Sequence, residues 1–99
     1  MNTVEPLPLL QVSIQRALLG EVTGNLISVT CGIRGNRITI RAYYVGVVQA
    51  EDVERMGSVG AEVAADFPED FMVDEECCSL EKDSEVCLDF WAFRRARDE

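Results

Sequence analysis

The sequence predicts one α+β domain over residues 1–99, with a four-stranded antiparallel sheet and two helices packed on one of its faces. Two segments carry apolar residues at helical spacing, and four others alternate apolar with polar residues, as strands do. These segments follow each other in the order α-β-β-α-β-β. Two hairpins with a helix before each give the predicted architecture, and a chain of 99 residues can bury one modest core.

The first helix is expected over residues 8–19. Pro8 suits its first turn, where a backbone N–H is not needed, and Gly20 suits its end. The apolar positions at i, i+4, i+7 and i+8 form one stripe, made of Leu10, Ile14, Ala17 and Leu18.

A β-hairpin follows, with strands expected over residues 26–33 and 37–45. Gly35 and Asn36 lie between them, and both residue types tolerate the positive φ that two-residue hairpin turns require. One face of this hairpin is apolar, and its solvent side carries Arg37, Thr39, Arg41 and Tyr43.

The second helix is expected from Ala50 to Asp66. Acidic residues crowd its first turn, where negative charge suits the helix dipole, and Pro68 prevents its continuation. Gly57 and Gly60 each lower helix propensity by about 1 kcal/mol relative to alanine. We interpret them as positions where the helix packs closely on the sheet.

The last two strands are expected over residues 71–80 and 86–94, with a turn at residues 82–84. The earlier strand alternates poorly, because Glu75 shares a parity with apolar residues, and one bulge would reconcile the pattern. In the later strand, Trp91 and Phe93 share a parity. With Tyr43 they are expected on the sheet face that the helices leave half exposed, near Arg37, Arg41 and several carboxylates.

The chain carries 18 acidic and 9 basic residues, a net charge of −9. This bias disfavours binding to nucleic acid or to an anionic membrane, which both need positive surface, and favours fast association with a basic partner. No apolar run approaches the roughly 18 residues of a membrane span, and the N-terminal stretch lacks the regions of a signal peptide. We therefore expect a cytoplasmic protein with reduced cysteines.

Six carboxylates crowd residues 66–78, DFPEDFMVDEECC, a density that raises the question of a catalytic or metal-binding site. A carboxylate pair can act as general acid and base, but 18 acidic residues make chance pairs plentiful. The chain has no histidine and no phosphate-binding glycine loop, which excludes the usual nucleophilic arrangements. The spacing fits neither a calcium loop nor a zinc site.

These exclusions predict a protein with no cofactor, no metal and no enzymatic activity. Cys31 and one of Cys77 or Cys78 are expected in the core, where free cysteines are common. A solvated surface is the usual explanation of such a charge run and stays open. The chain-wide negative bias and the nearby aromatic residues favour a protein interface instead.

Two stretches, ALLGEVTGNLISV (17–29) and AEVAADFPEDF (61–71), resemble small bacterial proteins of about this length, several of which are encoded near toxin genes. In layout, the whole chain resembles the immunity proteins of contact-dependent growth inhibition systems and colicins. That resemblance implies a short cytosolic chain that binds the toxic C-terminal domain of a cognate effector, often a basic nuclease, and blocks its active site. These families share little sequence, so no binding residue is carried over by motif.

On this resemblance, we expect carboxylates to attract the toxin and aromatic side chains to anchor it. The protein is expected to be a monomer or weak dimer. A non-enzymatic interaction module, such as a subunit of a larger complex or a chaperone for a secreted effector, is the alternative function. The expected toxin-binding residues are Asp66, Glu69, Asp70, Asp74, Glu76, Tyr43, Trp91 and Phe93.

Overall fold

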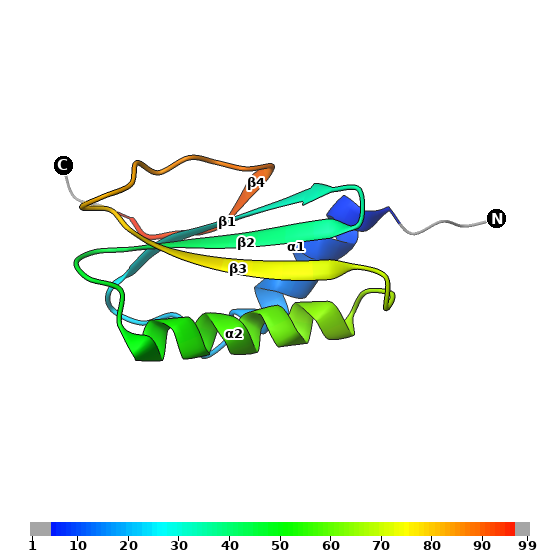
Figure 1. Ribbon diagram of the computed structural model, residues 1–99, viewed down its shortest axis with the longest axis horizontal. Coiled ribbons are helices and arrows are strands. Elements are labelled where there is room, and N and C mark those ends of the chain that lie inside the picture. The colour runs from blue at the N-terminus through cyan, green and yellow to red at the C-terminus, as the bar shows by residue number, and fades with distance from the viewer. Residues whose placement is uncertain (1–4, 97–99) are drawn as a thin grey trace.

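The computed structural model describes residues 5–96, which form a sheet layer and a helix layer (Figure 1). Both helices cover the same face of the sheet, as predicted. We call the other face of the sheet the open face. The helices are α1 (Pro6–Ala17) and α2 (Ala50–Ala65), and the strands are β1 (Leu26–Arg34), β2 (Arg37–Tyr44), β3 (Met72–Ser79) and β4 (Phe90–Arg94).

The first helix, α1, begins two residues before its predicted start. Pro6 as well as Pro8 fits into the first turn, where backbone N–H groups have no partner in the helix. The helix ends at Ala17, and Gly20, with φ of +81°, lies in the turn that follows.

The second helix, α2, begins where its acidic first turn predicts. Asp52 accepts a hydrogen bond from the backbone N–H of Gln49 at 2.9 Å and another from Asn25 Nδ2 at 3.0 Å. This carboxylate therefore caps the helix and ties it to the start of β1. Asp66 is the C-terminal cap of α2 rather than its last residue.

The β1–β2 hairpin is confirmed. Its strands pair antiparallel and end in a two-residue turn in which Gly35 has a φ of +61°. No other residue type among residues 5–96 has a positive φ, so Asn36 does not share this conformation. A positive φ at the first central residue alone is the pattern of a type II′ turn.

The predicted antiparallel sheet is wrong in one pairing, because β3 runs parallel to β2. The strand order is β3-β2-β1-β4, so β3 and β4 lie at opposite edges and form no hairpin. The physical reason is α2. A helix-length connection brings the chain back to the starting end of β2, and the next strand then runs in the same direction.

The segment between β3 and β4 crosses the open face from one edge of the sheet to the other (Figure 1). We call residues 80–89 the crossing segment; part of it was predicted as strand. Small polar side chains of the sheet hold it in place. Thr30 Oγ1 accepts a hydrogen bond from Leu88 N–H at 2.8 Å, and Ser28 Oγ donates to Glu85 at 2.6 Å.

A register shift in β4 corrects the predicted position of Phe93. Trp91 pairs with Thr30 on the open face, but Phe93 pairs with Val29, whose side chain lies in the core. The extra residue of this bulge shifts the alternation of side chains between the two faces by one position. Phe93 therefore packs against the core, and the prediction that it shares a face with Trp91 is wrong.

The core lies between the sheet and the helix layer. Side chains at alternate positions of β1 and β2 point into it, and both helices cover them. Its fully buried members include Leu10, Ile14, Leu26, Val29, Cys31, Ile38, Ile40, Val59 and Val63.

The irregular alternation of β3 needs no bulge, because its eight residues pair with β2 in one uninterrupted register. Val73, Glu75 and Cys77 face the helix layer, where α2 has a glycine opposite the carboxylate. A Cβ built on Gly60 would lie 2.4 Å from Glu75 Oε2. The close packing predicted for this glycine is thus an approach between α2 and Glu75.

Alanine substitutions at the two helix glycines are expected to differ. Gly57→Ala should stabilise the protein by about 1 kcal/mol through helix propensity, since its Cβ would meet only Glu75 Oε1 at 4.0 Å. Gly60→Ala should gain less, because the Glu75 side chain must move. Urea denaturation of both variants measures the difference. An equal or larger gain for Gly60→Ala would contradict the close contact.

Candidate protein-interaction surface

The structure places the predicted carboxylates at three separate locations. Asp66 lies in the helix layer, where its Oδ2 accepts hydrogen bonds from Ser13 Oγ at 2.7 Å and from Arg16 Nη2 at 2.8 Å. Both donors belong to α1. This carboxylate therefore joins the two helices, and an arginine of the same layer balances its charge.

Glu69 and Asp70 form the second location, in the loop between α2 and β3, where both are exposed. The loop is attached to the hairpin turn, because Asn36 Nδ2 donates a hydrogen bond to the backbone oxygen of Asp70 at 2.6 Å. Neither carboxylate forms an ion pair with another residue of the described range 5–96. Their charges face solvent.

Asp74 and Glu76 form the third location, on the open-face side of β3. Arg37 of β2 donates to Asp74, and Arg41 Nε donates to Glu76 at 2.6 Å. The hydrogen bond to Glu76 raises the pKa of Arg41. These pairs lie at the surface, where such a pair contributes about 0–1 kcal/mol to stability. They leave the carboxylates accessible to a partner.

Glu75 is a surface carboxylate that the sequence reasoning left out of the site. It lies between Asp74 and Glu76 in sequence but on the opposite side of the strand, beside α2. Partial burial and the neighbouring charge of Asp74 raise the pKa of Glu75. Its shared parity with Val73 and Cys77 is the sequence signal that could have placed it there.

The predicted aromatic anchors do not form an exposed cluster. Tyr43 is only 2% exposed, beneath the crossing segment. Its hydroxyl accepts a hydrogen bond from Val86 N–H at 3.0 Å and donates to Val86 O at 3.3 Å. Trp91 is half-buried at the other edge of the sheet, with the Arg94 guanidinium 4.6 Å from its ring centre. Phe93 packs on the core side.

Trp91 and the β3 carboxylates are separated by the width of the sheet. Three strand spacings lie between β3 and β4, which is about 14 Å. The predicted toxin-binding residues therefore do not make one surface. Glu69, Asp70, Asp74 and Glu76 lie along one edge, and the structure adds Glu75 to them.

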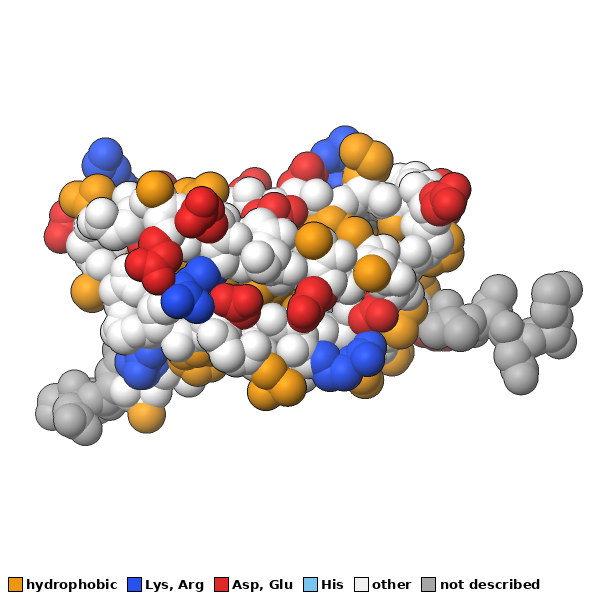
Figure 2. Space-filling model, turned by 90° about the horizontal axis from the view of Figure 1, so that it is seen from below, with side chains coloured by type: hydrophobic (Ala, Val, Ile, Leu, Met, Phe, Trp, Pro, Cys, Tyr) orange, Lys and Arg blue, Asp and Glu red, His pale blue; other side chains and the backbone are white. Residues whose placement is uncertain are grey.

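The helix layer also carries carboxylates, but arginines lie among them (Figure 2). Arg55 of α2 bridges two acidic side chains, Glu51 at 3.0 Å and Glu21 at 3.1 Å. Negative charge is thus spread along this layer, with cations between, rather than gathered in one patch (Figure 2).

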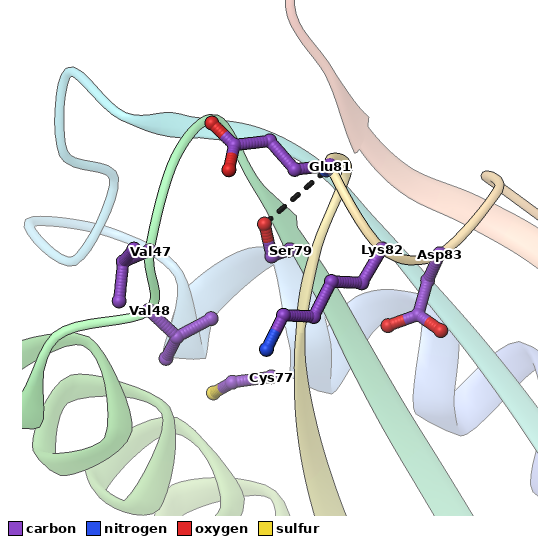
Figure 3. Close-up of a pocket in the computed structure, with 7 residues that line it drawn as sticks. All are labelled: Val47, Val48, Cys77, Ser79, Glu81, Lys82 and Asp83. Atoms are coloured by element: carbon purple, nitrogen blue, oxygen red, sulfur yellow. Dashed lines mark hydrogen bonds between the residues drawn. The ribbon is translucent and has the colours of Figure 1, made fainter.

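A pocket of about 300 Å³ lies where β3 ends, and the Cys77 thiol is part of its lining (Figure 3). Burial raises the pKa of the Cys77 thiol, an effect larger than the opposing hydrogen bond with Tyr44. The thiol is therefore neutral at pH 7 and a poor nucleophile. The pocket is lined by Val47, Val48, Cys77, Ser79, Glu81, Lys82 and Asp83.

The described residues were also compared with the ligand sets of metal sites, and no cluster suited to a metal ion occurs among residues 5–96.

Asp89 holds the end of the crossing segment to β1 through hydrogen bonds that its carboxylate accepts. Its Oδ2 accepts from Ile33 N–H at 2.8 Å and from Arg34 Nη1 at 3.0 Å. The backbone donor, more than the arginine, lowers the pKa of Asp89.

This lowered pKa predicts an acid-sensitive contribution to stability. The contribution is present above the ordinary aspartate pKa of about 3.9 and is lost as pH falls through the lower folded pKa. Asp89→Asn should therefore be less stable than the natural protein at pH 7, and the difference should shrink on acidification. Thermal unfolding over a pH series measures it. A difference that does not change with pH would contradict the role of the charge.

A family model described as MafI2 immunity protein matches residues 9–97. The chain belongs to the MafI2 immunity protein family. The match begins within α1 and extends past the end of β4, so it covers the described fold except for residues 5–8. No curated protein matches this chain.

Membership in the MafI2 immunity protein family confirms the predicted resemblance to toxin-neutralising immunity proteins. In this MafI2 family member, none of the helices within residues 5–96 has the length and apolar character needed to cross a membrane.

Proposed function

We propose that this MafI2 family member binds a cognate toxin domain, a basic nuclease, and neutralises it by covering the surface that contacts the substrate. The family match over residues 9–97 is the observation that carries the proposal. The chain has 18 acidic and 9 basic residues, and this negative charge supports the choice of a basic partner. A nuclease is such a partner, since it must present positive charge to nucleic acid. The proposed place of action is the cytoplasm, and contact-dependent delivery of the toxin stays a prediction.

The proposed binding surface is the acidic edge, which we define as β3 with its flanking residues, 69–83. This segment contains seven carboxylates and one lysine. With Arg37 and Arg41, which pair with it, the local net charge is −4. Four predicted toxin-binding residues lie here, together with Glu75. Asp66, Tyr43 and Phe93 do not lie on this surface, and Trp91 lies at the far edge.

Negative charge at this edge would act first on the rate of association. Long-range attraction between opposite charges raises the association rate of protein pairs and orients them before contact. An inhibitor that meets a lethal enzyme benefits from such fast capture. The same charges would occupy the positive surface that the toxin needs for its nucleic acid.

Co-expression tests the function directly. A candidate toxin domain, taken from a gene that neighbours the gene for this chain, should kill cells when expressed alone and spare them when this protein is present. Death in both cases would contradict neutralisation. An interaction module with another role, the alternative function, gives no protection in this assay.

A matched pair of double variants tests the location. Asp70→Asn with Glu75→Gln removes two charges from the acidic edge. Glu54→Gln with Glu62→Gln removes the same charge from α2. The first pair should slow association with the toxin domain by about tenfold, and the second by less than about threefold, because steering depends on where the charge lies. Stopped-flow mixing at several salt concentrations measures both rates. Equal slowing would contradict the acidic edge as the binding surface.

A further inference from the structure

We propose that the toxin docks by adding a basic strand to the outer edge of β3. This inference rests on the proposed function and specifies how the partner is recognised. The strand order β3-β2-β1-β4 leaves two edges in the sheet. An extended segment can continue a sheet at such an edge through main-chain hydrogen bonds.

The register of β3 shows which backbone groups are available. Met72 N–H donates to Asn36 O and Leu80 N–H donates to Tyr44 O, both at 2.9 Å. In a parallel pair, alternate residues turn both backbone groups to the same neighbour. The even-numbered residues of β3 therefore face β2, and the odd-numbered residues face outward.

Val73, Glu75 and Cys77 thus direct their N–H and C=O groups away from the sheet. No hydrogen bond within residues 5–96 reaches these backbone groups. They form a row of three donors and three acceptors along one edge. An incoming strand needs such a row to pair with β3 over about six residues.

The two edges of the sheet differ in how they are protected. Natural edges are blunted by short length, bulges, prolines, lysines or other charged side chains. The five-residue strand β4 is short and its pairing contains a register shift. Just beyond it, the Arg95 side chain donates to Leu26 O at 3.0 Å. The eight-residue strand β3 is longer, pairs without a shift and contains neither proline nor lysine.

The charged side chains of β3 are all carboxylates, and their negative charge favours a basic partner. Asp74 and Glu76 flank it on the open face, and Glu75 flanks it on the helix face. Two copies of this chain paired through β3 would bring six such carboxylates together, and like charges across strands are destabilising. A strand that carries lysine or arginine at these positions would instead find opposite charges on both faces. The charge pattern therefore favours the basic toxin over a second copy.

Amide hydrogen exchange tests strand addition directly. The protein is measured alone and mixed with the toxin domain that it neutralises in the co-expression assay. In the free protein, the amides of Asp74 and Glu76 should exchange slowly because they bond to β2, while those of Val73, Glu75 and Cys77 should exchange fast. In the complex, the three outward amides should slow by at least about tenfold.

Two failures of this experiment are distinct. A complex in which the three outward amides keep their fast exchange overturns strand addition and leaves the proposed function intact. If no complex forms, both the proposed function and this inference are overturned.

A proline substitution gives a second measurement. Glu75→Pro removes an outward N–H without removing a bond to β2, and proline is tolerated at such edge positions. The matched control Glu75→Thr removes the same charge and keeps the N–H. Glu75→Pro should weaken toxin binding at least about tenfold more than the control, because a strand addition loses one main-chain bond. Titration calorimetry measures both, and equal affinities overturn the proposal.

Discussion

Tyr43→Ala is expected to lower the free energy of unfolding by about 3–5 kcal/mol, as for other large aromatic truncations. The side chain is 2% exposed between the sheet and the crossing segment. Its loss leaves a cavity and removes both hydrogen bonds to Val86. A domain of this size has about 5–15 kcal/mol of stability, so the variant loses a large share of it. Urea denaturation measures the change.

The matched control for this variant is Tyr43→Phe, which keeps the ring and removes the hydroxyl. Its expected loss is about 1–2 kcal/mol, because Val86 keeps its backbone groups but loses their partner. If Tyr43→Ala costs no more than the control, the ring is not packed beneath the crossing segment.

Thr30→Val is expected to destabilise the protein by about 2–3 kcal/mol although the two side chains have nearly the same shape. Thr30 is fully buried on the open face. Its Oγ1 accepts from Leu88 N–H at 2.8 Å and donates to Phe90 O at 2.7 Å. Valine leaves a donor and an acceptor without this partner. Urea denaturation gives the loss, and faster exchange of the Leu88 amide locates it.

Thr39→Val is the control for Thr30→Val. Thr39 lies on the same face but is only half-buried, and no side-chain hydrogen bond of Thr39 occurs in the described structure. Its substitution should change stability by less than about 0.5 kcal/mol. Equal losses at both positions would mean that the hydroxyl of Thr30 does not hold the crossing segment.

Most of the segments that form helices and strands could be predicted from the sequence, but the pairing of the strands in the sheet could be predicted only in part. Periodicity reports which residues share a face, so it finds α1, α2 and the β1–β2 hairpin. It carries no information on which strands pair across long separations. The pattern at Val86 and Leu88 alternates as a strand does, yet these residues cross the open face. Ser28 and Thr30 are polar, buried and hydrogen-bonded to this segment, so their polar side chains were the sequence signal of that contact.

The bulge in β4 was invisible for a similar reason. Trp91, Ala92 and Phe93 are all apolar, so a shift by one residue leaves no mark on the hydrophobic pattern. The position of Phe93 depends on its pairing with Val29, which lies more than sixty residues away in sequence.

The sequence predicted that the candidate site is acidic, but it predicted only some of the residues that lie together there. The acidic stretch does contain the edge that we propose for the toxin. Which carboxylates are balanced depends on tertiary contacts, such as the approach of Arg16 to Asp66 from fifty residues away. The place of β3 at an edge also follows from topology. A charged residue at an inward parity, Glu75, was the local sign that this strand is incompletely covered.

The route of the chain after β3 has a consequence for the order of folding. A two-residue turn closes the β1–β2 hairpin, a contact that forms within microseconds in small chains. β4 must instead reach β1 over about sixty residues, as in the bond from Thr30 to Phe90, and such nonlocal pairings form slowly. During folding, β1 is therefore expected to remain an unpaired edge until residues 80–94 have crossed the sheet. The speed of that crossing sets how long this edge is open to aggregation.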